Sequence, residues 1–435
     1  MSDQNPQAGL DSSAAAGSPS PASLQRKGAE GAEPGATRVL AEQFRPEIVA
    51  LRRALHQVPE YDLDLPKSQA LVLEALVGLD LEITLGKELS SVTAVLRGTA
   101  PTDGVRPVVL LRGDMDALPV TERTDVPFKS QHPGMMHACG HDLHVAGLFG
   151  AAKILHALRD QLAGDVVFMF QPGEETSGGA PIMIREGVLD AAGRRADYAY
   201  GLHVGSAGQP FGMWSSKPGS FMAAADQLHV RVVGAGTHGS TPYRGKDPIP
   251  VACELVTALQ MMITRQFDVF DPVVLTVGRI AGGTKENIIP DDAFFDATVR
   301  TFSEQTRAKV QRTSTQLVES IAAAHGLTAE VDYQIGYPVT VNNPDEHGFA
   351  RDTIVDLFGP DRFRERPNPR CGAEDFSYVL NEIPGVYLNL SACAGPDPDA
   401  AADNHSPLAN FDDTVVPDGS ALLAELAVRR LSRGA

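Results

Sequence analysis

Four short runs of apolar residues punctuate this sequence without polar alternation. They lie at residues 105–112, 165–170, 198–204 and 386–390. Runs of this kind are typical of strands that a sheet buries on both faces. Apolar residues with helical spacing lie between them, notably over residues 142–158. The pattern therefore predicts an α/β fold with a buried central sheet.

The pattern near the start of the chain predicts a tail followed by a helix. Residues 1–37 are rich in Ala, Ser, Gly and Pro and contain no aromatic residue, so they cannot bury enough apolar surface to offset the entropy of ordering. They also lack the basic start and apolar segment of a secretory signal. We expect a disordered tail, with order beginning near Arg38. Apolar residues then recur with helical spacing, and Pro46 lies either near the first turn of one helix or at a break between two short ones.

The segment from residue 221 to residue 337 follows a different rhythm. Strand-like and helix-like patterns alternate there in the order β-α-β-β-α-β, which is the split βαβ arrangement. The expected elements are strands at 227–234, 273–280, 293–302 and 328–333, with helices at 248–264 and 304–325. We therefore predict a ferredoxin-like domain inserted into a larger α/β domain, whose two halves would be residues 38–220 and 338–435.

Acids and imidazoles follow the predicted strands at the point where each strand ends. Asp114 and Asp116 follow the first run, Glu174 and Glu175 follow the second, and His203 ends the third. A single acid after a strand is commonly a turn residue. The carboxyl ends of strands in an open α/β sheet border the ligand crevice, so three such ends together favour a functional site.

The densest cluster of possible metal ligands is MMHACGHDLH, residues 135–144. Cys139 and His141 lie two residues apart, and a thiolate with imidazole and carboxylate suits zinc or a neighbouring transition metal. Structural zinc sites usually carry paired ligands such as CxxC, and this segment has none, so an open catalytic site is favoured. Asp142 could cap the helix that follows.

Two further histidines in the same cluster, His137 and His144, are interpreted differently. His144 lies three residues after His141 on a similar helix face and could support the ligands from behind. His137 precedes the turn. For both, an ordinary hydrogen-bonded histidine is the favoured interpretation, so neither is included among the metal ligands.

The adjacent residues Glu174 and Glu175 are expected to have different roles. Neighbouring side chains on an extended backbone point in opposite directions, so both are not expected to bind one metal in the same way. One can be a ligand while the other acts as general base toward a water. The surrounding glycines of QPGEETSGG would permit the tight loop that this requires.

Charge and cysteine content narrow the class of protein. The 435 residues include 37 Lys and Arg against 55 Asp and Glu, a formal net charge of −18, which argues against nucleic acid as a partner. No stretch reaches the ~18 apolar residues that a membrane span needs. Four cysteines cannot form a disulfide framework, and Cys253, Cys371 and Cys393 have no spaced partners. We expect Cys253 and Cys371 to be packing thiols. A cytoplasmic location is expected.

These motifs together resemble a known family, the aminoacylases, hippurate hydrolases and auxin-conjugate amidohydrolases. The resemblance covers residues 40–430 and rests on eight motifs in the family's order: LRGDMDALP, MMHACGHDLH, FQPGEETSGG, GLHVG, GTHGSTPYRGKDPI, ENIIPDDAFFDATVRTF, GAEDFSYV and NHSPLANFDD. It implies a metallopeptidase-like catalytic domain with the inserted domain as lid and dimerisation domain. It also implies two divalent metal ions, zinc or manganese in the first place, with cobalt or nickel as alternatives.

The resemblance also assigns roles to individual residues. It implies five metal ligands, Glu174 as the general base, and Asp116 as the residue that orients a ligand histidine. His238 would complete a neighbouring active site across a homodimer and stabilise the oxyanion. Asn287 and Arg300 match contacts to a substrate carboxylate, although structural roles at strand ends fit them nearly as well. The five ligands are Cys139, His141, Glu175, His203 and His405.

The expected activity is hydrolysis of the amide bond of an N-acyl or aryl amino acid, a small-molecule substrate. A dipeptidase or a deacetylase of an amino-acid precursor would use the same catalytic residues. A catalytically silent binding module would lack a base or a ligand, and this sequence lacks neither. A cysteine hydrolase or disulfide oxidoreductase using Cys139 would not explain the accompanying His203, His405 and Glu175. Tyr243 follows Pro242 where the family often has a second histidine, a departure that bears on specificity.

Overall fold

The computed structural model describes residues 35–102 and 104–432. The predicted disorder of the tail falls on residues 1–34, which lie outside the described residues. The predicted end of the tail at residue 37 is wrong, because helix α1 spans Ala36–Gln57. Thr37 is fully buried, and its hydroxyl donates a hydrogen bond to Glu425 Oε2 at 2.8 Å. This contact fixes the start of α1. Pro46 lies inside the one continuous helix.

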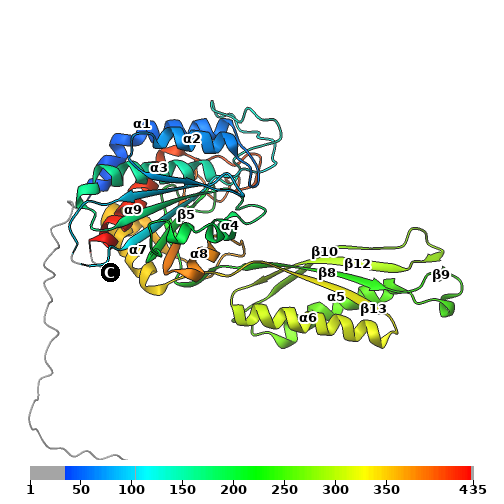
Figure 1. Cartoon of the computed structure of the whole chain (residues 1–435). Helices are drawn as coiled ribbons and strands as arrows, with labels where there is room; N and C mark the ends of the chain where they lie inside the picture. Colours follow the sequence, from blue (N-terminus) through cyan, green and yellow to red (C-terminus); the bar gives the residue numbers. More distant parts are fainter. Residues whose placement is uncertain (1–34, 103, 433–435) are drawn as a thin grey trace, which may run out of the picture. The chain divides into compact units, whose positions relative to one another are not determined.

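The larger sheet has eight strands in the order β1-β2-β4-β3-β5-β16-β6-β15 (Figure 1). Its centre is parallel, because β4, β3, β5 and β16 run together, whereas β2 is antiparallel to β4 and β6 is antiparallel to β16. This mixed sheet confirms the predicted fold class. The strands are β1 (Glu82–Leu85), β2 (Val92–Arg97), β3 (Val108–Asp114), β4 (Asp165–Gln171), β5 (Tyr198–Gly205), β6 (Trp214–Ser216), β15 (Phe363–Glu365) and β16 (Gly385–Ser391).

Helices cover both faces of this sheet. One hydrophobic core joins the sheet to α1, α2 (Pro66–Leu76), α3 (His141–Ala157), α7 (Pro344–Phe358) and α9 (Val416–Leu431). A second core on the other face includes side chains of α4 (Gly179–Arg185) and α8 (Ser377–Glu382). Burial on both faces is the physical reason that the strands read as continuous apolar runs.

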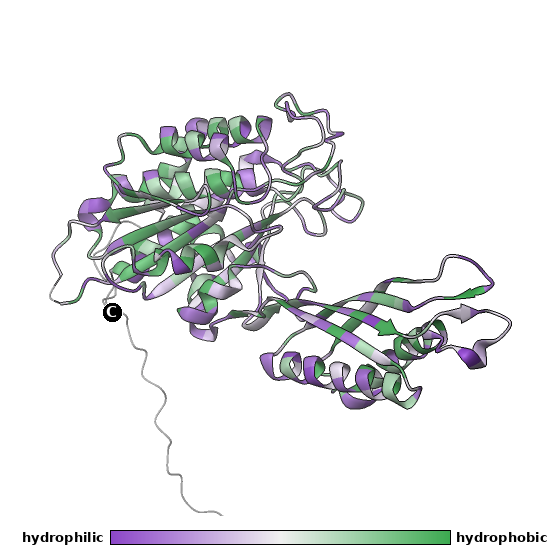
Figure 2. Cartoon of the chain, turned by 45° about the vertical axis from the view of Figure 1, so that its right-hand side comes forward, coloured by the Kyte–Doolittle hydropathy of each residue, from purple (hydrophilic) through white to green (hydrophobic). Residues whose placement is uncertain are grey.

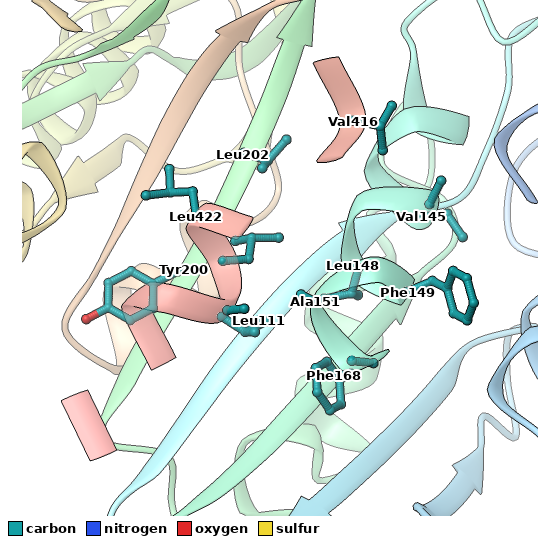
Figure 3. Close-up of a cluster of buried hydrophobic side chains, with 14 of the residues drawn as sticks. Leu111, Val145, Leu148, Phe149, Ala151, Phe168, Tyr200, Leu202, Val416 and Leu422 are labelled. Atoms are coloured by element: carbon teal, nitrogen blue, oxygen red, sulfur yellow. The ribbon is translucent and has the colours of Figure 1, made fainter. Parts of the chain in front are cut away.

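In the first core, side chains of α3 and α9 pack against side chains of the strands. Figure 3 shows Leu148 of α3 and Leu422 of α9 beside the strand residues Leu111 and Phe168. All four side chains are fully buried. Because α3 begins at His141, this packing also fixes the helix end that carries a predicted metal ligand.

The smaller sheet has four antiparallel strands in the order β10-β12-β8-β13. Along the chain, β8 (Ala224–Val233), α5 (Pro248–Gln266), β10 (Val274–Gly282), β12 (Asp292–Thr301), α6 (Glu304–Ala324) and β13 (Thr328–Tyr337) follow one another in the order β-α-β-β-α-β. Both helices lie on one face, with their own hydrophobic core (Figure 1). Figure 2 shows alternating hydropathy along these strands, because only one face is covered.

Two short pairs of strands complete the secondary structure. β7 (Gly219–Met222) pairs with β14 (Thr340–Asn342) where the chain enters and leaves the smaller sheet. β9 (Thr237–His238) pairs with β11 (Ile288–Ile289), and this pairing sets Ile288 opposite His238.

Both cysteines predicted to be packing thiols are exposed, so that prediction is wrong. Cys253 lies on α5, whose buried stripe runs through Val251, Ala252 and Leu255 and passes Cys253 by. Cys371 is exposed in the loop before α8. Cys393, by contrast, is buried.

Candidate metal centre

The structure brings the five predicted ligands together, and we call Cys139, His141, Glu175, His203 and His405 the metal cluster. Cys139 Sγ lies 3.4 Å from His203 Nε2 and 3.3 Å from His405 Nε2. His405 Nε2 lies 3.1 Å from Glu175 Oε1. Tetrahedral zinc with bonds of about 2.0–2.3 Å holds its ligand atoms roughly 3.3–3.7 Å apart, so these separations suit ligands of a shared ion.

The metal cluster contains two overlapping sets of ligands. Cys139, His141 and His203 form one set, and Cys139, Glu175 and His405 form the other; within each set the ligand atoms lie within 4.8 Å of one another. Cys139 belongs to both sets. The residues of the two sets could therefore hold two ions between them.

Separate segments of the backbone hold these ligands in place. Gly140 has φ 84°, a conformation natural to glycine, which lets the chain turn between Cys139 and the start of α3 at His141. His405 has φ 71°, a costly conformation for a residue with a Cβ, and its N–H donates to Ala138 O at 2.8 Å. A strained backbone at this position supports a functional role for His405.

Two polar atoms of the metal cluster have no partner. Within the described part of the chain, neither ring nitrogen of the buried His141 forms a hydrogen bond. Burial raises the pKa of the Cys139 thiol to about 12. A cation would satisfy these atoms and hold the thiolate form, because a buried anion needs a compensating charge. The residues present therefore fit a metal centre.

The two glutamates do not point in opposite directions, contrary to the expectation from an extended backbone. They lie in a turn after β4, and both carboxylates come within 4.8 Å of His141. Their surroundings differ. Burial raises the pKa of Glu174 well above its usual range, and the charges of Glu374 and Glu175 add to that effect. Burial also opposes ionisation of Glu175, but the hydrogen bond with His405 and the charges of His141 and His405 together outweigh burial and lower the pKa.

Asp116 fixes the turn that carries the two glutamates. Its Oδ1 accepts a hydrogen bond from the Glu174 N–H at 3.1 Å, and its Oδ2 accepts one from the Glu175 N–H at 2.9 Å. Oδ1 also lies 3.4 Å from His141 Nδ1. Asp116 thus connects the base candidate with two members of the metal cluster.

A paired network adjoins the metal cluster where Asp114 Oδ2 lies 3.5 Å from His141 Nε2, and we call it the Arg112 network. Arg112 is fully buried, and its guanidinium donates to Asp114 at 2.6 Å, Gln171 at 2.9 Å, Glu374 at 2.8 Å and Asp375 at 3.0 Å. All five residues come from strand ends or from the loop before α8. The network joins β3, β4 and that loop.

His144 is hydrogen-bonded, as predicted. Its Nδ1 bonds to Asp114, and its Nε2 accepts from the Val204 N–H at 2.8 Å, one residue beyond His203 of the metal cluster. The same interpretation is wrong for His137, whose two ring nitrogens have no partner among the described residues. Burial and the nearby cations of His56 and His141 lower the pKa of His137 to about 3, so its ring is neutral.

A second paired group holds the start of α3 from the side of α1, and we call it the His56 network. His56 Nδ1 lies 2.8 Å from Asp142 Oδ2, and its Nε2 lies 3.3 Å from Glu122 Oε1. Arg52 Nε lies 2.8 Å from the same Asp142 oxygen. Asp142 therefore does not cap the helix as predicted. The N-cap position is Gly140, and the Asp142 side chain is occupied by these partners.

Three predicted site residues lie outside the metal cluster of their own chain. His238 is exposed, and its Nδ1 lies 2.8 Å from Ser240 Oγ. Asn287 lies close by, since its carbonyl accepts from the Gly239 N–H at 2.8 Å. Arg300, on β12, donates to Thr298 Oγ1 at 2.6 Å and lines an open cavity of about 460 Å³ on the uncovered face of the smaller sheet. The structure thus brings His238 and Asn287 together and leaves Arg300 apart.

Sequence reasoning missed several residues that shape the site. Asn404 Nδ2 donates to Cys139 O at 3.1 Å and to Val204 O at 3.0 Å, so one side chain ties three segments. Tyr337, at the end of β13, donates its hydroxyl to Glu174 O at 2.6 Å. Glu374 and Asp375 lie within the motif GAEDFSYV, whose paired acids were a signal that could have been used.

Comparison with known proteins gives the family. A model of the peptidase family M20/M25/M40 matches residues 110–429. Thermostable carboxypeptidase 1 of Saccharolobus solfataricus is 37% identical over 392 residues, covering 88% of this chain and 95% of that protein. The N-acetyl-L-cysteine deacetylase of Bacillus subtilis is 35% identical, covering 88% of each chain. IAA-amino acid hydrolase ILR1-like 2 of Arabidopsis thaliana is 35% identical, covering 92% of this chain and 89% of that one.

Solved structures agree with these relatives. The Bacillus subtilis YXEP protein, a dinuclear metal-binding peptidase of the M20 family, has a TM-score of 0.76 and 29% identity, covering 90% of this chain and 99% of its own. The chain belongs to the peptidase family M20/M25/M40. Within that family it is a metal-dependent amidohydrolase, which confirms the predicted class of enzyme. Among its described helices, none is both long enough and apolar enough to span a membrane.

Proposed function

We propose that this protein hydrolyses the amide bond of N-acyl amino acids, with an aliphatic or aryl acyl group, and releases an amino acid and a carboxylic acid. The observation that carries the proposal is the glutamate pair beside the metal cluster. The pKa of Glu174 is raised by burial and by neighbouring acids, whereas that of Glu175 is lowered by His405. Two carboxyl groups whose environments push their pKa values apart are suited to different roles in one reaction.

Two divalent ions fit the metal cluster as its two overlapping ligand sets. Zinc and manganese are the first candidates, and cobalt and nickel also suit a mixed thiolate, imidazole and carboxylate set. Ions held there supply Lewis acidity, which polarises an amide carbonyl and makes a water more acidic.

The residues of the chain account for the proton movements. Glu174, as a carboxylate, takes a proton from the attacking water and then delivers it to the leaving amine. Its backbone is held on both sides of the Cα atom, because Asp116 accepts from its N–H and Tyr337 donates to its carbonyl. This fixed position keeps the carboxyl group beside the metal cluster throughout the reaction.

The test separates the base from the ligand. Glu174→Gln is expected to lower kcat by at least ~10²-fold while bound metal, measured by elemental analysis, stays near two equivalents. Glu175→Gln should lose metal as well as activity. Equal loss of metal in both variants would show that the roles are wrongly assigned, and less than half an equivalent in the reconstituted, folded wild type would contradict the two-ion centre.

A substrate panel tests the specificity. N-acyl amino acids with acetyl, benzoyl and indole-3-acetyl groups are compared with dipeptides and with N-acetyl-L-cysteine. The names of the relatives include a carboxypeptidase, a deacetylase and amino acid hydrolases, all of which would use the same catalytic residues. Preference for dipeptides would replace the proposed substrate class. Binding of panel members without hydrolysis by metal-loaded protein would favour a silent binding module.

We also propose that two copies share their active sites, with His238 of one chain stabilising the oxyanion in the other. His238 is exposed and makes no described contact with its own metal cluster. Strand β10 is an edge of the smaller sheet, and the exposed apolar residues Val274, Ile280 and Met261 lie on it and on the neighbouring α5. A free edge with exposed apolar side chains is suited to symmetric pairing.

Mixing two inactive variants tests this sharing. When Glu174→Gln and His238→Ala subunits exchange, half of the dimers would hold one intact site, and activity should return to roughly a quarter of wild type. Absence of recovery, with exchange demonstrated by mass spectrometry, would confine His238 to its own chain.

We propose that Asn287 and Arg300 contact the α-carboxylate of the amino-acid moiety.

We also propose a cytoplasmic location, because the four cysteines form no disulfide.

A further inference from the structure

A small cavity opens at the carboxyl ends of β5 and β16. Its volume is roughly 190 Å³, and its walls include Asn389, Ser215, Arg366, Arg370 and, at the rim, Asp403. One water needs only ~10–15 Å³, so the cavity can hold a small polar group together with a short carbon chain.

The cavity contains buried polar groups without partners. Asn389 is 6% exposed, and neither its amide nitrogen nor its amide oxygen has a hydrogen-bond partner among the described residues. Ser215 is fully buried with an unpartnered hydroxyl, and Arg366 Nε is unpartnered as well. Leaving such groups unpaired is costly, so their concentration in one cavity points to a ligand that pairs with them.

The two arginines of the cavity also differ from the buried arginines elsewhere. Arg52, Arg112 and Arg307 each form ion pairs with carboxylates. Within residues 35–102 and 104–432, no carboxylate forms an ion pair with Arg366 or Arg370. Asp403 is exposed at the rim, and its Oδ1 accepts from the Asn404 N–H at 2.9 Å. The cavity therefore carries a net positive charge.

The location connects this cavity to the reaction. Asn389 pairs with the ligand His203 across the parallel strands β16 and β5, so their side chains leave the same face of the sheet. Asp403 lies two residues before the ligand His405. The cavity residue Asn389 and His203 of the metal cluster therefore project from the same face of the sheet.

We propose that this cavity is a carboxylate-binding subsite that recognises an acidic group of the substrate through Arg366, Arg370 and the Asn389 amide. Guanidinium groups bind carboxylates through paired hydrogen bonds, and an amide N–H adds a neutral donor. The proposal rests on the proposed amide hydrolysis. It predicts a preference for substrates with a carboxylate at the far end of the acyl group, as in N-succinyl amino acids, or with a free α-carboxylate.

Paired substrates distinguish these two sources. N-succinyl-L-methionine and N-butanoyl-L-methionine differ in the acyl carboxylate, whereas N-benzoyl-L-methionine and its α-carboxamide differ in the α-carboxylate. Arg370→Met should lower the ratio of kcat/KM between charged and neutral members of one pair by about 10- to 100-fold, mostly through KM. Arg364→Met removes a charge from the exposed face of β15, outside the cavity, and should leave both ratios unchanged. Unchanged ratios for Arg370→Met would overturn the proposal.

A conservative variant and a direct measurement guard against misfolding. Asn389→Asp keeps the side-chain size and places a carboxylate beside the arginines, so it should reduce the same ratio. Calorimetric titration of the metal-loaded protein with succinate should show affinity lowered about 10-fold or more in both variants. Equal succinate affinity in wild type and variants would mean that succinate binds the metals alone, which refutes the subsite. If no amide is hydrolysed by wild type, the proposed function fails while the titration still decides the subsite.

Discussion

Two groups of buried polar side chains lie at the carboxyl ends of the central strands of the large sheet. They differ in how completely their polar atoms are hydrogen-bonded. In the Arg112 network the guanidinium nitrogens of Arg112 all have acceptors. Asp375 also accepts from the Gln171 side chain and from the Ala180 N–H. In the metal cluster, neither buried ring nitrogen of His141 forms a hydrogen bond with a described residue. Paired groups hold a fold in place, whereas unpaired groups at such depth are available for a ligand.

Hydrogen-bond pairing distinguishes residues that support the site from residues available to a ligand, even within one motif. Asp114 and Asp116 lie two residues apart in LRGDMDALP, yet Asp114 is bound by Arg112 and His144, and Asp116 holds the turn of the glutamate pair. Residue type alone would have made both candidates for ligands. The state of pairing shows that each supports a different neighbour.

The largest effect on stability is expected from a substitution in the Arg112 network. Arg112→Met would leave Asp114, Glu374 and Asp375 buried together without their cation. Removing one partner of a buried ionic group costs about 3–5 kcal/mol, so the free energy of unfolding in urea should fall by that amount. Arg231→Met, which removes an exposed pair with Asp292, should cost at most ~1 kcal/mol. Similar losses in both variants would contradict the distinction between buried and exposed pairs.

The fold was more predictable than the pairing. The apolar runs of β3, β4, β5 and β16 identified the sheet centre because these strands are buried on both faces. β6 and β15 have only three residues each, too few to show a period, and they were missed. The helix over residues 142–158 was placed within one residue at each end, since its packing against the sheet produces the periodic pattern.

The ligands of the candidate site were predictable as residue types, but their partners were not. Cys139 and His141 share one short motif, whereas the contact between Tyr337 and Glu174 joins residues 163 positions apart. The exposure of Cys253 was missed because the hydrophobic stripe of α5 passes one residue to its side. Long-range contacts of this kind follow from the tertiary fold and leave no local pattern.

The His56 network predicts a dependence of stability on pH. Burial opposes ionisation of Glu122, but hydrogen bonds from His56, Thr124 and the Ser130 N–H outweigh it and lower its pKa to about 2. A depressed pKa contributes stability above the unfolded value near 4.5 and loses it as pH falls toward 2. Wild type should therefore lose roughly 3 kcal/mol more than Glu122→Gln between pH 4.5 and pH 2. Parallel stability curves for the two proteins would contradict this contribution.

Metal binding at the metal cluster should stabilise the protein by slightly less than the two effects described above. Zinc at 100 times its dissociation constant is expected to raise the free energy of unfolding by about 2.7 kcal/mol, and a chelator should remove the gain. Cys139→Ser should abolish most of it, because Cys139 belongs to both ligand sets. Cys393→Ser, a change at a buried cysteine outside the metal cluster, is the matched control and should retain it. Equal gains in the two variants would remove Cys139 from the metal centre.

The smallest effect is expected where the smaller sheet reaches the base. Tyr337 is the last residue of β13, and its hydroxyl donates to Glu174 O at 2.6 Å, so a single hydrogen bond links that sheet to the turn of the glutamate pair. Tyr337→Phe removes the hydroxyl and keeps the ring, which contacts Tyr378 edge to face. The net loss of one such bond is about 0.5–1.5 kcal/mol. Because Asp116 still holds the Glu174 N–H, metal content should stay unchanged while kcat falls by about 2- to 10-fold through a less fixed base. Tyr333→Phe, which removes a hydroxyl of the same strand that donates to Asp226, is the control and should leave kcat unchanged. A fall in metal content in Tyr337→Phe would show that Tyr337 supports the ligands rather than the base.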